Sequence, residues 1–160
     1  MENTVQCTAK ICTRAETLSP SDLELLTTAR QAAESAYAPY SHFFVGAAVR
    51  LVGGQIVQGA NQENVAYPSG LCAERVALFS AFSQFPNGEL DTIAITAMTA
   101  SENGTYVYTA MPITPCGACR QVLCEYAARA SNPVRVLLGG TKEIWIIDDA
   151  RQLLPFAFTF

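Results

Sequence analysis

Two short cysteine segments constrain this chain more than any other feature of its sequence. One is CAER at residues 72–75, and the other is PCGACRQ at residues 115–121. Each falls where a buried helix is predicted to begin, the second directly after a proline. Their first cysteines lie 44 residues apart (116 minus 72), which leaves room for a helix, a strand and a loop. We therefore predict two neighbouring helices on one face of a sheet, with their N-termini close together.

The residues at these helix starts suit a catalytic zinc ion. Cys72, Cys116 and Cys119 offer three thiolates that can converge, because side chains in the first helical turn lean toward the N-terminus. Helix N-termini also favour thiolate over thiol. Three ligands leave a fourth position open for a water, whose pKa zinc lowers to about 7. Glu74, two residues from a ligand, is predicted to carry protons.

Three thiolates carry more negative charge than one zinc ion neutralises. Arg75 and Arg120 follow the ligand cysteines closely, and we predict that both donate hydrogen bonds to the sulfurs. Contacts of this kind tune metal sites strongly. The alternative is that both are surface arginines in ordinary ion pairs.

The composition indicates one domain in a reducing compartment. A chain of 160 residues with 50% hydrophobic content can build one full core, which we place at residues 20–160. Residues 1–19 are expected to be a poorly ordered extension without a secretion signal, so we expect a cytoplasmic protein with reduced cysteines. No apolar run approaches the roughly 20 residues of a membrane span.

The charge of the chain argues against nucleic acid as a partner. The net charge is −4 and the sequence pI is about 4.9, and no basic run is present. A polynucleotide backbone would be repelled. We expect a small substrate that is not a polyanion.

The pattern of apolar and turn residues predicts a three-layer α/β/α fold, with a mixed sheet of about five strands and helices on both faces. A helix is expected from the N-cap Ser19 to about Tyr37, with Leu23 among its core residues, and a hairpin is expected around a two-residue Gly53-Gly54 turn. Residues 100–113 are predicted to be a loop, with a short strand at 106–108 as the alternative. The other expected elements are helices at 71–84 and 116–129 and strands at 90–99, 134–138 and 144–147.

Several ordered blocks of sequence resemble the short-chain, nucleoside-specific cytidine deaminases. The resemblance runs from about Ala36 to Phe158. Three departures are Phe44, where that family often has proline, a longer loop at 100–113, and residues 1–19, which match none of its blocks. The blocks are YAPYSHF (37–43), VGAA (45–48), NQEN (61–64), YPSG (67–70), CAER, PCGACRQ and LLP (153–155).

The resemblance implies a zinc-dependent enzyme that hydrolyses cytidine and deoxycytidine to uridine and deoxyuridine plus ammonia, as in pyrimidine salvage. It implies one zinc per subunit on Cys72, Cys116 and Cys119, with Glu74 as the proton carrier and no organic cofactor. It also implies a homotetramer whose sites are completed across interfaces. The implied substrate contacts are Asn61 and Glu63 on the ribose, Phe43 on the pyrimidine, the backbone of Ala73 on the exocyclic amine, and Tyr67 and Phe158 in a neighbouring subunit's pocket.

Other interpretations stay open. The chain could deaminate a modified cytosine nucleoside such as blasticidin S, or hold a structural zinc with Cys7 or Cys12 as fourth ligand. Nucleic-acid editing is disfavoured by the acidic pI. His42 is more readily a structural hydrogen-bonding residue than a metal ligand, and Cys124 is expected to be buried. The phenylalanines at 156, 158 and 160 are expected to be buried in the core or at an interface.

Overall fold

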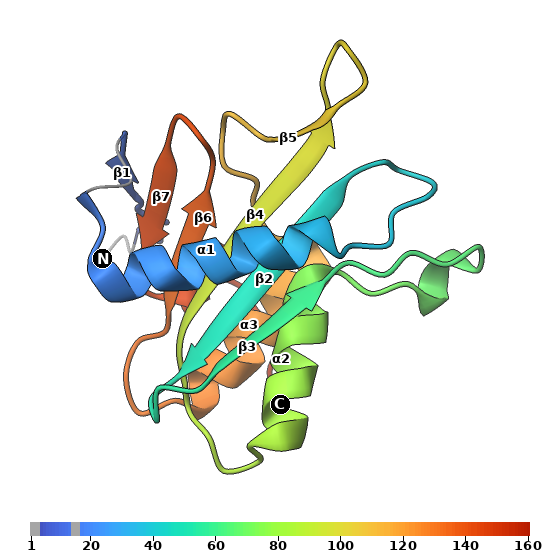
Figure 1. The fold of residues 1–160 in the computed structure, drawn as a ribbon. Coiled ribbons are helices and arrows are strands. Elements are labelled where there is room, and N and C mark those ends of the chain that lie inside the picture. The colour runs from blue at the N-terminus through green and yellow to red at the C-terminus, as the bar shows by residue number, and fades with distance from the viewer. Residues whose placement is uncertain (1–3, 14–16) are drawn as a thin grey trace.

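The computed structural model describes residues 4–13 and 17–160 of the chain. A single twisted sheet lies between helix α1 on one face and helices α2 and α3 on the other (Figure 1), which confirms the predicted three-layer α/β/α fold. The elements are β1 Lys10–Cys12, α1 Pro20–Glu34, β2 Phe44–Leu51, β3 Ile56–Ala60, the 3₁₀ turn η2 Tyr67–Ser69, α2 Ala73–Gln84, β4 Leu90–Ala100, β5 Tyr106–Tyr108, α3 Gly117–Arg129, β6 Arg135–Gly139, β7 Ile144–Ile147 and the 3₁₀ turn η3 Ala150–Leu153.

The sheet has more strands than the sequence predicted. Over the described residues it contains seven, in the order β1-β7-β6-β4-β2-β3, with β5 paired to β4. Among these strands β4 and β6 pair in parallel and the other pairs are antiparallel, so the sheet is mixed as expected. The two additional strands, β1 and β5, have three residues each, which is too short for a period-two pattern to stand out.

Strand β1 corrects the prediction for the N-terminal segment. Residues 10–12 pair antiparallel with β7 and form one edge of the sheet, so this part of the segment belongs to the folded domain. Residues 1–3 and 14–16 lie outside the described residues.

Helix α1 begins as predicted and ends earlier than predicted. The Ser19 hydroxyl accepts a hydrogen bond from the Asp22 amide at 3.2 Å, as an N-cap does. The helix ends at Glu34 instead of about Tyr37. Leu23 is wrong as a core residue, because its exposed fraction is 39%, and Leu25 is buried in its place.

The turn between β2 and β3 contains three residues, where two were predicted. The Leu51 amide donates to the Gln55 carbonyl at 2.9 Å, which closes the loop over residues 52–54. Gly54 has a φ of +86°, as the last position of a three-residue hairpin loop requires. Gly54 is therefore the third residue of the turn, whereas the sequence predicted it as the second of two.

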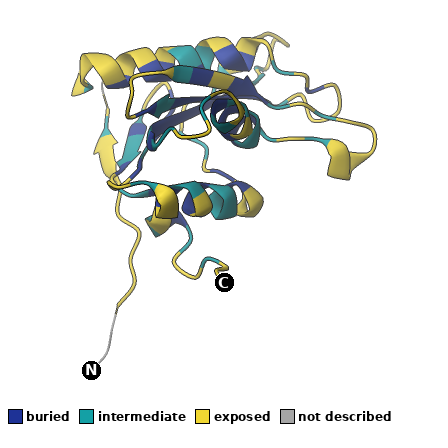
Figure 2. Cartoon of the chain, turned by 90° about the horizontal axis from the view of Figure 1, so that it is seen from below, coloured by how far each residue is buried: buried dark blue, intermediate teal, exposed yellow. Residues whose placement is uncertain are grey.

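The core alternates along the strands between the two faces of the sheet. Ala47, Ile95 and Leu138 pack under α2 and α3, whereas their neighbours Ala48 and Ala94 pack under α1. Figure 2 shows the buried sheet between the helical layers, whose outer faces are exposed. Of the helices that the structure describes, none combines the length and apolar character needed to cross a membrane.

Candidate metal centre and nucleoside pocket

The starts of α2 and α3 lie at the same end of the sheet (Figure 1) and share an unusual N-cap. Cys72 caps α2 and Cys116 caps α3, and both have extended backbone angles. Neither side chain makes a capping hydrogen bond, although a cap side chain ordinarily accepts from an amide of the first turn. Both sulfurs therefore remain available to a ligand.

The three predicted zinc ligands come together. The Sγ atoms of Cys72, Cys116 and Cys119 all lie within 4.8 Å of one another, and the first two are 3.8 Å apart. In tetrahedral zinc sites with a Zn–S bond of about 2.3 Å, neighbouring sulfurs are separated by about 3.8 Å. The donor set therefore fits zinc in both chemistry and spacing.

The electrostatics of the three sulfurs also favour a divalent cation. A hydrogen bond from Cys119, assisted by Arg75 and Cys116, lowers the pKa of Cys72 to about 5. The pKa of the Cys119 thiol is raised because it shares its proton with Cys72 and is buried. Three sulfurs this close ionise together only when a cation neutralises them, and soft thiolates select zinc among the common metals.

Glu74 is buried beside the sulfurs in the first turn of α2, with an exposed fraction of 3%. Burial raises the pKa of its carboxyl group, and the charge of Cys72 raises it further. A carboxyl group whose pKa is raised toward the working pH can both accept and release a proton. Gly59 on β3 brings this turn close to the sheet, because a Cβ atom there would lie 2.4 Å from the Ala77 amide nitrogen.

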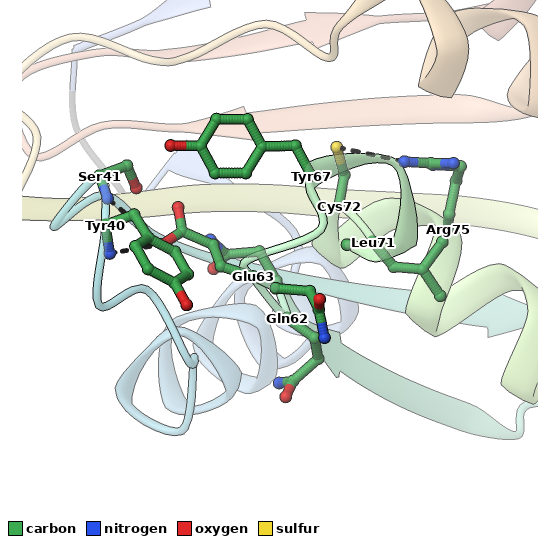
Figure 3. A pocket seen from close by; sticks show the side chains of 11 residues that line it. Tyr40, Ser41, Gln62, Glu63, Tyr67, Leu71, Cys72 and Arg75 are labelled. Atoms are coloured by element: carbon green, nitrogen blue, oxygen red, sulfur yellow. Dashed lines mark hydrogen bonds between the residues drawn. The ribbon is translucent and has the colours of Figure 1, made fainter.

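The two arginines predicted to contact the sulfurs differ. Arg75 donates from Nη2 to the Cys72 sulfur at 3.8 Å, as expected, and Figure 3 shows its guanidinium directed at that sulfur. Arg120 is a correction. Its Nε donates to the Pro115 carbonyl at 2.8 Å, and its terminal nitrogens donate to Thr114 and to the Leu153 carbonyl. Arg120 therefore fixes the backbone ahead of α3.

A cavity of about 480 Å³ opens beside Cys72. Its walls include Asn61. They also include Glu63, Tyr67 and Arg75 (Figure 3), so three of the predicted substrate contacts share one pocket with the predicted zinc ligand Cys72. A volume of this size is typical of small-molecule sites.

The loop residues of the pocket are held by backbone contacts that the sequence did not reveal. The Glu63 carboxylate accepts hydrogen bonds from the amides of Tyr40 and Ser41 at 2.9 and 3.2 Å. Hydrogen bonding from the Ser41 hydroxyl, followed by these amides, lowers the pKa of Glu63. The Asn61 amide group donates to the Phe43 carbonyl at 3.0 Å. Tyr40 and Ser41 stand within the YAPYSHF block, but only the folded chain shows that they face Glu63.

The remaining predicted contacts lie outside the residues that line this cavity. Phe43 directly precedes β2 and is partly buried against the core, and the Ala73 side chain is fully buried at the first position of α2. Phe158 is 66% exposed, and its backbone exchanges two hydrogen bonds with the Gln121 side chain. Tyr67 lines the cavity and is nevertheless 75% exposed.

The aromatic tail is not buried in the core of its own chain. Phe156 and Phe160 are exposed together with Phe158, and Phe158 and Phe160 pack edge to face with ring centroids 5.2 Å apart. Of the two expectations for this tail, the first is therefore wrong within a single chain, and burial at an interface stays a prediction.

The other cysteines and the histidine occupy separate places. His42 is exposed, and its Nδ1 lies 3.3 Å from the Tyr106 hydroxyl, a contact consistent with the predicted hydrogen-bonding role. Cys124 is buried, as expected. In the described part of the chain, the group of three sulfurs includes neither Cys7, which is exposed, nor Cys12, which lies in the edge strand β1.

Comparison with known proteins identifies the family of this chain. Residues 19–132 match the family model described as the cytidine and deoxycytidylate deaminase zinc-binding region. The chain belongs to this deaminase family. A relative named cytidine deaminase from Halalkalibacterium halodurans is 42% identical over 137 residues, which cover 84% of this chain and 92% of the relative.

Other members of the family support the same assignment. The crystal structure of cytidine deaminase from Burkholderia pseudomallei has 38% sequence identity and a TM-score of 0.68, covering 84% of this deaminase and 97% of the solved chain. A relative named blasticidin-S deaminase from Bacillus cereus is 32% identical over 110 residues, which cover 69% of this chain and 76% of the relative. The resemblance identified from the sequence blocks is confirmed.

Proposed function

We propose that this deaminase hydrolyses cytidine and deoxycytidine to uridine and deoxyuridine with release of ammonia. The observation that carries the proposal is the junction of three sulfurs, a buried carboxyl group at Glu74 and a cavity of about 480 Å³. Sulfur ligands alone would also suit a structural metal. The adjoining cavity and the buried acid are features of a site that binds and converts a small molecule.

Cys72, Cys116 and Cys119 would hold one zinc ion per subunit. When bound, zinc acts as a Lewis acid that lowers the pKa of a water molecule. Arg75 offsets part of the negative charge of the ligand set through its hydrogen bond to Cys72.

Glu74 would move the protons of the hydrolysis. Its carboxylate accepts a proton from the attacking water and gives it to N3 of the pyrimidine, while the water oxygen bonds to C4. It then passes the second water proton to the exocyclic nitrogen, the C4–N bond breaks, and ammonia leaves. The Ala73 backbone is proposed to contact the amine, and Phe43 to pack on the ring.

Glu63 and Asn61 are proposed to bind the ribose. The Glu63 carboxylate is ionised at neutral pH, and hydrogen bonds lower its pKa further, so it can accept a hydrogen bond from a sugar hydroxyl. Asn61 already donates one amide hydrogen to Phe43 and has a second hydrogen for a ligand. A free nucleoside of neutral charge suits this site better than a polyanion, since the chain has a net charge of −4.

The exposed aromatic residues support a homotetramer with shared sites. Tyr67 is 75% exposed and Phe158 is 66% exposed, and aromatic side chains are enriched where protein surfaces meet. In the proposed assembly each lies against a neighbouring subunit's pocket. No nucleic acid and no membrane is proposed as a partner. A cytoplasmic role in pyrimidine salvage is proposed because the sulfur ligands must stay reduced.

A deaminase of a modified cytosine nucleoside is the second candidate, favoured by the similarity to the relative named blasticidin-S deaminase. The ratio of kcat/KM for cytidine to that for blasticidin S decides between them. A higher value for blasticidin S would overturn the first proposal.

Incubation of the purified protein with cytidine tests the main proposal directly. We expect a change in the ultraviolet spectrum, stoichiometric ammonia and one zinc per chain. Cys116→Ser should lose both zinc and turnover. The double variant with Cys7→Ser and Cys12→Ser should keep both, since neither cysteine belongs to the sulfur group. Zinc loss in the double variant, with no ammonia from the wild type, would instead indicate a structural metal.

A further inference from the structure

The hairpin formed by β4 and β5 has a hydrogen-bonded tip. The Ser101 amide donates to the Thr105 carbonyl at 2.7 Å, and Gly104 has a φ of +79°. This is the same three-residue turn that joins β2 to β3. The Asn103 side chain accepts from the Thr105 hydroxyl at 2.8 Å, so the turn satisfies its own polar groups. Residues predicted to form a loop are thus an ordered projection of the sheet.

Tyr108 anchors the base of this hairpin on α1. Its hydroxyl lies 3.0 Å from both the Arg30 carbonyl and the Glu34 carboxylate, and its one hydrogen is shared between these two acceptors. The Arg30 guanidinium lies 5.8 Å from the centre of the tyrosine ring. The Thr109 amide continues the pairing with a hydrogen bond to Ala97 at 3.0 Å. The hairpin is therefore fixed to the same rigid layers that carry the site.

Tyr106, two residues from this anchor, contacts the segment that leads into β2. Its ring packs edge to face on Phe44, with centroids 4.5 Å apart. Its hydroxyl lies 3.3 Å from Nδ1 of His42. His42 has a φ of +53°, and non-glycine residues seldom adopt the left-handed region unless their surroundings hold them there.

The same segment forms a wall of the nucleoside pocket. The amides of Tyr40 and Ser41 bind the Glu63 carboxylate, and the Asn61 side chain binds the Phe43 carbonyl. Residues 40–44 are thus held from the pocket side by the two side chains proposed to bind ribose. Tyr106 contacts the segment at His42, which lies between Ser41 and Phe43, and at Phe44, which follows Phe43.

We propose that Tyr106 is a positioning residue for the nucleoside pocket, an inference that rests on the proposed function. It keeps residues 40–44 in the conformation that orients Glu63 and Phe43 for a nucleoside. Loss of this contact affects binding more than chemistry, because neither the sulfurs nor Glu74 contacts the segment in the described hydrogen-bond network.

Kinetics of three variants test this role. Tyr106→Ala should raise KM for cytidine at least about fivefold, the lower end of the effect of losing one hydrogen bond and one aromatic contact, with kcat nearly unchanged. Tyr106→Phe keeps the ring, so its KM for cytidine should lie between those of Tyr106→Ala and the wild type. Val107→Ala, an exposed neighbour on the same strand, is the control and should match the wild type. An unchanged KM in Tyr106→Ala, or a fall in kcat alone, would overturn the proposal.

A fourth variant, at His42, tests the contact between Tyr106 and His42 itself. Asparagine tolerates a positive φ, so His42→Asn should preserve the backbone while removing the imidazole. The double variant His42→Asn, Tyr106→Phe should have the KM of the worse single variant. Additive effects would show that the two side chains act independently, and would contradict the proposed contact.

Amide hydrogen exchange separates this inference from the proposed function. The amides of Tyr40 and Ser41 should exchange about tenfold faster in Tyr106→Ala than in Val107→Ala, because the segment that carries them is no longer held against Glu63. This measurement needs no turnover. If the wild type fails to deaminate cytidine, the proposed function fails, and the exchange rates still decide whether Tyr106 positions the segment. Equal rates in both variants would reject it.

Discussion

Helix α1 and the pair α2 and α3 begin in opposite ways. The Ser19 side chain caps α1 by accepting from the Asp22 amide, and a proline occupies the first helical position. Cys72 and Cys116 occupy the same position at α2 and α3 and cap nothing. One helix start obeys local stability rules, whereas the other two leave amides unsatisfied by the cap side chain.

At α2 and α3 the cap position carries a sulfur that can bind a metal ion, and the stabilising hydrogen bond of an ordinary cap is absent. A cap residue replaced by a non-capping one costs about 0.5–2 kcal/mol per helix. At α2 and α3 the sulfurs that do not cap instead face each other at 3.8 Å, where a metal ion can bind them. Places at which a chain breaks a local rule are expected to be functional sites.

The charged groups of the first turns differ in the same way. At α1, Asp22 is buried and accepts two hydrogen bonds from Arg135, both at 2.9 Å. At α2, Glu74 is buried without a cation on its carboxylate in the described ion pairs. Burial and the neighbouring Cys72 raise the pKa of Glu74, whereas the pKa of Asp22 is lowered. A paired carboxylate stabilises the fold, and an unpaired one can exchange protons.

The largest effect is expected at Glu74. Glu74→Gln keeps the shape and removes the titrating group, so kcat should fall by about 10²–10⁴-fold, the usual contribution of a general acid–base group. Zinc content and the unfolding temperature should stay close to those of the wild type. Turnover above one tenth of the wild-type value would exclude Glu74 as the proton carrier.

The next effect is expected in the stability of the α1 start. Asp22→Asn leaves Arg135 and the nearby Arg50 without their buried partner, and should lower the free energy of unfolding by about 3 kcal/mol at neutral pH. Asp91→Asn, which removes a more exposed partner of Arg50, is the control and should cost about 1 kcal/mol or less. Urea titration measures both. Equal losses in the two variants would contradict a special role for burial.

The loss in Asp22→Asn should depend on pH with a defined sign. Burial alone raises the pKa of Asp22, but hydrogen bonds from Arg135 and Ser19 and the charges of Arg135 and Arg50 outweigh it, so the folded pKa is lowered below 3.8. The stabilisation is therefore complete above the unfolded-state pKa and disappears as the pH falls through the lower folded value. The difference between wild type and variant should shrink below about pH 4.

A smaller effect distinguishes the two arginines. Arg75→Gln removes the donor to Cys72 and should lower kcat about tenfold while zinc is retained, because contacts to ligand atoms tune a metal site by roughly this factor. Arg120→Gln removes contacts to backbone carbonyls and should lower the unfolding temperature more than it lowers kcat. Identical kinetic and thermal profiles would remove the distinction between them.

The smallest effect is expected at the ordinary cap. Ser19→Ala should cost about 1 kcal/mol of unfolding free energy and leave kcat and KM unchanged. Ser83→Ala, at an exposed position inside α2, should cost nothing measurable, since alanine favours a helix interior. If the two variants are equally stable, the Ser19 cap contributes nothing to the stability of α1.

Much of the fold was encoded locally. Ser19 and Pro20 marked the start of α1, and the runs at 90–99 and 144–147 marked β4 and β7. The features that the sequence did not predict are either very short strands or depend on contacts with other segments of the chain. Strands β1 and β5 have three residues each. They form because β7 offers an unpaired edge and because the end of β4 extends past its partner β6. The burial of Leu25 in place of Leu23 depends on which face of α1 meets the sheet.

The site divides along the same line. The sequence alone determined the donor chemistry, since cysteines at two helix starts and a glutamate in the first turn follow from residue type and spacing. Only the tertiary structure decided that Arg75 reaches a sulfur while Arg120 holds backbone, that the Tyr40 and Ser41 amides meet Glu63, and that the β4–β5 hairpin rests on the pocket wall. Residue type sets what a group can bind, but the partner of a long side chain or loop depends on packing between segments far apart in the chain.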